Sequence, residues 1–158
     1  MENSRVTGFW HAGVTVSDME EALRFYRDGL GLELESRREL EGGYAGSIVG
    51  LEIDSIDAVF LSVPGSDAQV ELFEYRGVER HSASCRPCDH GAGHFCLYVE
   101  DLEALAARLR AAGFSARTEP VAIDRGPRAG ATVVYAIDPD GYHVELYEPP
   151  GSAAGPQD

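Results

Sequence analysis

Two histidines and two glutamates recur at matching places in two copies of one sequence pattern. The segment His11-Ala-Gly-Val-Thr-Val-Ser-Asp18 returns as His94-Phe-Cys-Leu-Tyr-Val-Glu-Asp101, and Val70-Glu-Leu-Phe-Glu74 returns as Val144-Glu-Leu-Tyr-Glu148. Imidazole nitrogens and carboxylate oxygens are common ligands of Zn, Ni, Co, Mn and Fe(II). The repeat therefore marks a candidate metal site. Its four residues are His11, Glu71, His94 and Glu145.

Each copy is expected to fold as a strand, a helix and three more strands, which predicts an α+β protein. Asp18 is expected to cap the first helix, which Gly29 and Gly31 end, and Asp101 is expected to cap the second. The expected helices cover 19–30 and 102–112, and the expected strands cover 9–17, 32–40, 56–63, 69–76, 93–100, part of 114–123, 131–137 and 142–148.

The two copies differ in length at one place. His94 follows His11 by 83 residues, whereas Glu145 follows Glu71 by 74, so the first copy is nine residues longer. The glycine-rich segment 41–55 accounts for the difference, and we expect a loop with a short helix there. The chain of 158 residues fits a single domain. Its expected parts are module one (8–76), a linker (77–92), module two (93–149) and a disordered tail (150–158).

Strand geometry shows how the four candidate ligands can meet. Alternate residues of a strand share one face, and each histidine lies on the first strand of its copy while each glutamate lies on the last. If two βαβββ modules form a curved mixed sheet, the four side chains converge on a cavity. Taken alone, Glu71 or Glu145 could face solvent and either histidine could be structural. The joint repetition favours the metal site, because a buried carboxylate is costly unless it is paired or bound to metal.

Composition narrows the classes of partner. A net charge of −14 disfavours nucleic acid and anionic membranes. Apolar residues make up 44% of the chain, but none of their runs approaches the roughly 20 residues of a membrane span. Three cysteines fit a reducing compartment better than a disulfide framework. Since the N-terminus also lacks a signal-peptide pattern, we expect a cytoplasmic protein.

The repeated motifs resemble those of the vicinal oxygen chelate superfamily, which includes glyoxalase I, methylmalonyl-CoA epimerase, extradiol dioxygenases and fosfomycin-resistance proteins. The matching segments cover most of the chain: His11-x-x-Val-x-Val-x-Asp18, Phe25-Tyr-Arg-Asp-Gly-Leu-Gly31, Val70-Glu-Leu72, Gly93-His94 and Asp138-Pro-Asp-Gly-Tyr-His-Val-Glu-Leu146. The resemblance implies the two-module fold. It leaves the reaction open, because one fold hosts several chemistries.

By this resemblance a divalent metal ion (Ni, Co, Zn, Mn or Fe(II)) would bind vicinal oxygens of a small substrate. A lyase or isomerase would then move a carbon-bound proton through an enediolate-like intermediate. The set His11, Glu71, His94 and Glu145 is similar to that of glyoxalase I, and it implies that Glu71 and Glu145 are both ligands and catalytic bases. Epimerases of the methylmalonyl-CoA type commonly carry glutamine at the place of Glu71. The resemblance also implies a homodimer.

Three other readings remain open. An Fe(II)-dependent extradiol dioxygenase would use His11, His94 and Glu145 as a facial triad and leave Glu71 without a role. Tyr135 fits the dioxygenase signature, but that signature also needs a histidine several residues earlier. A fosfomycin-type transferase likewise uses three ligands. A small-molecule binding or resistance protein usually lacks the ligands altogether.

Further residues border the expected cavity. His143 is either a pocket residue beside Glu145 or a surface histidine, and Arg128 either meets an anionic substrate group or is an exposed loop arginine. Tyr98 and Cys96 follow His94 on its face of the strand. Other candidates are the lid residues Tyr44, Ile48 and Leu51, and the linker motif Cys85-x-x-Cys88-x-His90, which resembles half a zinc site but fits an ordinary linker with exposed thiols.

Overall fold

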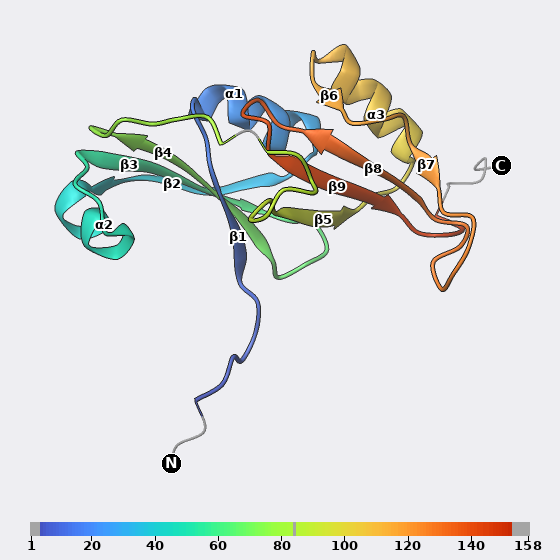
Figure 1. The fold of residues 1–158 in the computed structure, drawn as a ribbon, viewed down its shortest axis with the longest axis horizontal. Helices are drawn as coiled ribbons and strands as arrows, with labels where there is room; N and C mark the ends of the chain where they lie inside the picture. The colour runs from blue at the N-terminus through green and yellow to red at the C-terminus, as the bar shows by residue number, and fades with distance from the viewer. Residues whose placement is uncertain (1–3, 84, 153–158) are drawn as a thin grey trace. The chain divides into compact units, whose positions relative to one another are not determined.

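The computed structural model describes residues 4–83 and 85–152, and it confirms the α+β class (Figure 1). Part of the predicted disordered tail, residues 153–158, lies outside the described residues. The chain divides into two compact units. Unit 1 contains the chain up to Met19 and Leu32–Val78, and unit 2 contains Glu20–Gly31 and the chain from Glu79 on.

Unit 1 holds a mixed four-stranded sheet in the order β1-β4-β3-β2. The outer strand β1 runs parallel to β4, whereas β3 is antiparallel to both of its neighbours. The elements of this unit are β1 (His11–Thr15), β2 (Glu33–Glu41), α2 (Gly42–Val49), β3 (Ser55–Ser62) and β4 (Gln69–Arg76). The predicted strands of the first copy are therefore confirmed.

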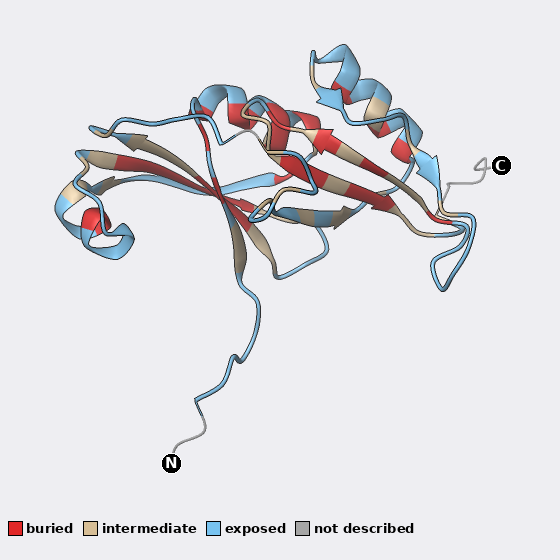
Figure 2. Ribbon diagram, in the orientation of Figure 1, coloured by how far each residue is buried: buried red, intermediate tan, exposed pale blue. Residues whose placement is uncertain are grey.

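Unit 2 repeats this topology in a sheet ordered β5-β9-β8-β6, with β7 also paired to β8. Strand β5 runs parallel to β9, as β1 does to β4. The elements are β5 (His94–Tyr98), α3 (Leu102–Ala111), β6 (Ser115–Ala116), β7 (Val121–Ala122), β8 (Thr132–Ile137) and β9 (His143–Glu148). In each unit the buried residues gather on the central strands, β3 and β4 or β8 and β9 (Figure 2).

The first helix differs from the regular α-helix that the sequence predicts. It starts as α1 (Met19–Leu23) and widens into a π-helix, η1 (Arg24–Gly29), where the Leu30 amide donates to the Phe25 carbonyl at 2.8 Å. The residues of η1 pack in unit 2. Phe25 contacts the Phe114 ring with centroids 5.1 Å apart, and the buried Tyr26 hydroxyl donates to Asp138 at 2.8 Å.

One glycine of this helix has a different role from the predicted one. Gly31 does adopt a left-handed conformation, with φ of 82°, and so ends the helix as expected. Gly29 instead lies inside η1, where a Cβ atom would stand 2.8 Å from the Leu109 side chain of α3. The absence of a Cβ atom at Gly29 thus lets η1 and the Leu109 side chain of α3 approach closely.

The second glutamate of each repeated motif contacts the start of a helix. The Met19 amide of α1 donates to Glu74 at 2.9 Å, and the Leu102 amide of α3 donates to Glu148 at 3.1 Å. Asp101 accepts the Ala104 amide at 3.0 Å, so its predicted capping role is confirmed. Such bonds satisfy amides that have no partner within their helix.

The glycine-rich segment forms a short helix, as predicted. Helix α2 packs Ala45 against Ile56 and Ala58 of β3. A Cβ atom on Gly46 would lie 2.6 Å from the Leu51 carbonyl oxygen, which explains a glycine at this position. The expected lid residues Tyr44, Ile48 and Leu51 are exposed. Within residues 4–83 and 85–152, no helix is long and apolar enough to cross a membrane.

Candidate metal site

Unit 1 brings together the first two predicted ligands. The His11 Nε2 atom lies 3.1 Å from Glu71 Oε2, and we call these residues the module-one pair. The parallel register of β1 and β4 creates this contact, because it sets His11 beside Gln69, two residues before Glu71 on the same face. Glu71 is only 8% exposed. Burial raises the pKa of its carboxyl group, and the nearby His11 and Arg38 lower it.

Unit 2 builds the same contact from the second copy. The His94 Nε2 atom lies 3.1 Å from Glu145 Oε2, and these residues form the module-two pair. Strands β5 and β9 share the register of the first unit, with His94 beside His143 and Cys96 beside Glu145. The two copies of the sequence motif therefore form the same contact, between a histidine Nε2 atom and a glutamate Oε2 atom. Each glutamate reaches back toward the histidine of its own module.

The two pairs differ in the aromatic residue beside them. Phe60 stands opposite Glu71 on β3, and Tyr135 stands opposite Glu145 on β8. The Tyr135 hydroxyl lies 3.3 Å from His94 Nε2 and donates to Glu145 Oε2 at 3.5 Å. Burial, followed by the charge of Glu145 and this hydrogen bond, raises the pKa of Tyr135. Module two therefore has a hydroxyl group where module one has an apolar ring.

The donor atoms of each pair fit a shared metal ion. In each pair an imidazole nitrogen and a carboxylate oxygen lie 3.1 Å apart, which is an ion-pair distance and also brings both donor atoms close enough to approach one ion. The His11 Nδ1 atom is buried and has no hydrogen-bond partner within the described residues. Searched over the same residues, the chain contains no group of three or more His, Cys, Asp or Glu side chains placed to hold an ion. Each unit by itself brings two of the four candidate ligands together.

His143 is a buried residue of the same sheet face, so the reading of it as a surface histidine is wrong. It is 3% exposed, and its Nε2 atom accepts a hydrogen bond from Arg117 Nε at 2.7 Å. Burial lowers the pKa of His143, and Arg117 and His94 lower it further. An imidazole nitrogen that accepts this bond is unprotonated. His143 therefore holds Arg117 in place as a neutral side chain.

Arg128 and Tyr98 lie at the other end of this face. The Arg128 guanidinium stands over the Tyr147 ring, 5.6 Å from its centroid, and the Tyr98 and Tyr147 rings are 5.7 Å apart. Tyr98 and Tyr147 each lie two residues beyond Cys96 and Glu145, so they point to the same side of the sheet. Tyr98 thus lies on the same sheet face as the module-two pair, and Arg128 covers the Tyr147 ring beside it.

Cys96 lies between the two ends of the face. Burial, together with the charge of Glu145, raises the pKa of the Cys96 thiol to about 11, although Arg128 opposes the shift. A thiol with this pKa is protonated at neutral pH and is a poor nucleophile. The linker cysteines Cys85 and Cys88 are free, and no cluster of three metal ligands in the described chain includes them.

Sequence reasoning missed two residues of the site. Arg117 follows the two-residue strand β6, where no periodicity or motif draws attention to it. Phe60 could have been found by aligning β3 with β8, because it takes the place of Tyr135. Phe60 contacts the His11 ring, with centroids 5.6 Å apart, whereas Arg117 contacts His143 beside the module-two pair.

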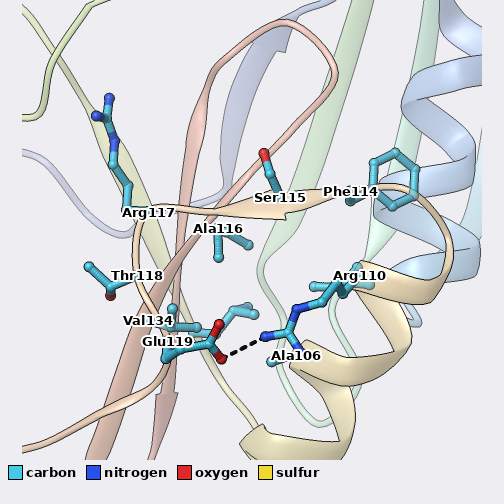
Figure 3. Close-up of a pocket in the computed structure, with 12 residues that line it drawn as sticks. Ala106, Arg110, Phe114, Ser115, Ala116, Arg117, Thr118, Glu119 and Val134 are labelled. Carbon is cyan, nitrogen blue, oxygen red and sulfur yellow. Dashed lines mark hydrogen bonds and ion pairs between the residues drawn. The ribbon is translucent and has the colours of Figure 1, made fainter.

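A cavity of about 360 Å³ lies on the opposite side of the unit 2 sheet, under α3 (Figure 3). Its floor includes Val134 and Ala136, which alternate along β8 with Tyr135 and therefore point away from the module-two pair. An ion pair between Arg110 and Glu119, 2.6 Å apart, lies beside it. None of the four candidate ligands lines this cavity, although Arg117 does.

Residues 8–146 match the sequence family described as the Glyoxalase/Bleomycin resistance protein/Dioxygenase superfamily. The chain belongs to this superfamily. It is 30% identical over 141 residues to a probable lactoylglutathione lyase from Synechocystis, covering 87% of this chain and 92% of that protein. It is also 29% identical over 146 residues to a 2-epi-5-epi-valiolone epimerase from Actinomyces, covering 90% and 80% of the two chains.

A solved structure supports the fold. A glyoxalase family protein from Bacillus cereus matches with a TM-score of 0.81 and 21% identity, over 96% of this chain and 99% of that one. The predicted fold and superfamily are thus confirmed. Similarity to a lyase and an epimerase supports an enzyme of glyoxalase type, and members of this superfamily use divalent metals, bind small substrates and are commonly dimeric.

Proposed function

We propose that the protein is a metal-dependent lyase or isomerase that moves a carbon-bound proton in a small substrate with vicinal oxygens. The single observation that carries the proposal is the repetition of one His–Glu contact at 3.1 Å in both modules. Two such pairs together provide the four ligands that we propose. In a facial triad of three ligands, by contrast, the close contact of Glu71 with His11 would have no role.

The proposed metal ligands are His11, Glu71, His94 and Glu145, with two imidazoles and two carboxylates as the donor set. This set accepts Ni, Co, Zn, Mn or Fe(II). A bound divalent ion would polarise the substrate oxygens and stabilise the negative charge of an enediolate-like intermediate. The protein residues then have to hold the substrate, exclude water and transfer one proton.

The surroundings of the two glutamates support different proton-transfer roles. Glu145 accepts a hydrogen bond from the Tyr135 hydroxyl, whereas Glu71 lies opposite the apolar Phe60 ring on the neighbouring strand. A carboxylate that accepts no hydroxyl hydrogen bond is the better proton acceptor, because such a bond stabilises its charged form. We therefore assign proton abstraction from the substrate carbon to Glu71. Glu71 then loses this proton to solvent, and Glu145, with Tyr135 beside it, delivers a solvent-derived proton to the substrate.

Removal of one carboxylate charge tests the proposal. Deuterium uptake from D₂O at a substrate carbon is followed by NMR for S-lactoylglutathione and 2-epi-5-epi-valiolone, the compounds that name the two relatives. The metal-loaded protein should exchange at least one of them, and Glu71→Gln should slow the exchange at least a hundredfold. Glu119→Gln, on the other side of the unit 2 sheet, serves as the matched control. Oxygen uptake with catechols that depends on Fe(II) and survives Glu71→Gln would overturn the assignment.

We further infer a homodimer whose metal ligands come from both copies, by analogy with a superfamily in which dimers are common. The test mixes two inactive variants, one without the module-one pair (His11→Ala with Glu71→Ala) and one without the module-two pair (His94→Ala with Glu145→Ala). Sites built across chains regain activity after subunit exchange, up to about a quarter of the wild-type value for random mixing. Sites built within one chain stay inactive in the mixture.

A further inference from the structure

Arg128 occupies one end of the face that carries the module-two pair. Its guanidinium stands over the Tyr147 ring at 5.6 Å, and hydrogen bonds to the Tyr147 and Tyr98 hydroxyl groups raise the pKa of Arg128. Tyr98 is 76% exposed, so this end of the face is open to a ligand. A guanidinium held against a ring is preorganised, and it has five N–H donors in total.

The charge environment of Arg128 differs from that of nearby arginines. Arg125, in the same loop, pairs with Asp124 at 3.1 Å, and Arg110 pairs with Glu119 at 2.6 Å. Among the residues described here, no carboxylate oxygen lies within 4 Å of the Arg128 guanidinium nitrogens. In a chain with a net charge of −14, an arginine that has aromatic neighbours instead of carboxylates is available to an external anion.

The position of Arg128 fixes where an anion would sit relative to the metal ligands. Tyr147 follows Glu145 by two residues on β9, which places the two side chains ~7 Å apart along the same face. A ligand whose oxygens reach the module-two pair can therefore extend a second group to Arg128. The other arginine of the face, Arg117, already donates its Nε hydrogen to His143 at the far end.

We propose that the natural substrate carries an anionic group, a carboxylate or a phosphate, in addition to its chelating oxygens, and that Arg128 binds this group between Tyr98 and Tyr147. The inference rests on the proposed function, since it names a substrate class for the same site. Two parallel N–H···O bonds from a guanidinium suit either anion. The exposed Tyr98 hydroxyl group adds a further donor.

Hydroxamates separate the anionic group from the chelating oxygens. Glycolohydroxamate chelates a metal through two vicinal oxygens, and phosphoglycolohydroxamate and malonohydroxamate add a phosphate and a carboxylate to a similar core. Calorimetry on the Ni-loaded protein should show that at least one anionic compound binds at least tenfold more tightly than glycolohydroxamate. The variant Arg128→Met should lose this preference and bind glycolohydroxamate as the wild type does. Arg125→Met, the matched loop control, should keep the preference.

A titration without metal distinguishes failure of this inference from failure of the proposed function. Inorganic phosphate and malonate are added to the metal-free, ¹⁵N-labelled protein, and the arginine Nε–H signals are followed by NMR. The Arg128 signal should shift saturably, while that of Arg125 should not. If the hydroxamates fail to bind but Arg128 still responds, the metal site is wrong and the anion site stands. An Arg128 signal that does not move, or an anion preference that survives Arg128→Met, overturns the inference.

Discussion

Tyr135 places its hydroxyl oxygen 3.3 Å from His94 Nε2. The same hydroxyl reaches Glu145, so one side chain contacts both members of the module-two pair. Module one has Phe60 at the matching place and therefore offers no such group. This difference distinguishes the module-two pair from the module-one pair, and the proposed division of proton-transfer roles between the two glutamates rests on it.

Tyr135→Phe should make the two halves of the site alike. The substitution removes a long hydroxyl contact with a carboxylate, 3.5 Å, which is weaker than an ordinary charged hydrogen bond and is worth ~1 kcal/mol, so we expect turnover to fall about fivefold. Metal content should stay near the wild-type value, because the ligands are unchanged. Steady-state kinetics combined with metal analysis checks this expectation, and Tyr44→Phe controls for the loss of an exposed hydroxyl. Full activity in Tyr135→Phe would show that the hydroxyl has no part in the reaction.

Glu148→Ala should affect stability and leave metal binding intact. Glu148 accepts the Leu102 amide at the start of α3, and loss of a helix cap costs ~1 kcal/mol. Urea denaturation should therefore show a lower midpoint with an unchanged slope, while metal affinity stays the same. Glu145→Ala, three residues earlier on the same strand, should lose metal affinity instead. Glu52→Ala, at an exposed loop position, is expected to change neither. A metal affinity that falls equally in both β9 variants would contradict this division of roles.

The sequence predicted those parts of the fold that local patterns determine. Strands β1 and β9, helix α3 with its Asp101 cap, and the glycine-rich α2 all lie where periodicity and turn residues placed them. The superfamily followed from the same motifs. The repeat places His11 on the first strand and Glu71 on the last strand of the same copy, as it does His94 and Glu145, so the sequence suggested that the two residues could come together.

Other features depend on contacts between distant residues and could not be read from local patterns. The π-helix η1 has the apolar spacing of an α-helix, and only the hydrogen bond from Leu30 to Phe25 reveals the difference. Glu74 accepts the Met19 amide because the start of α1 lies beside β4, a contact between residues 55 positions apart in the sequence. Likewise, the bond between Arg117 and His143 depends on the placement of a strand two residues long.

Tyr26→Phe should reduce the fall in the free energy of unfolding that occurs as the pH rises above about 10. Burial of Tyr26, followed by the charge of Asp138 and the hydrogen bond to it, raises the pKa of the Tyr26 hydroxyl well above its ordinary value. The unfolded chain releases this proton near pH 10 while the folded protein keeps it, so the unfolded state binds fewer protons above that pH. The free energy of unfolding must then fall as pH rises, by up to ~1.4 kcal/mol per pH unit for this group.

Below pH 10 the hydroxyl is protonated in both states and its stabilising contribution is fully present. Tyr26→Phe also removes the 2.8 Å hydrogen bond to Asp138, so we expect a loss of ~1–2 kcal/mol at pH 7. Urea denaturation of both proteins between pH 7 and about pH 11 gives the two curves, and their difference isolates Tyr26 from other tyrosines. The curves should converge above pH 10. Parallel curves over the whole range would show that Tyr26 titrates alike in the folded and unfolded states.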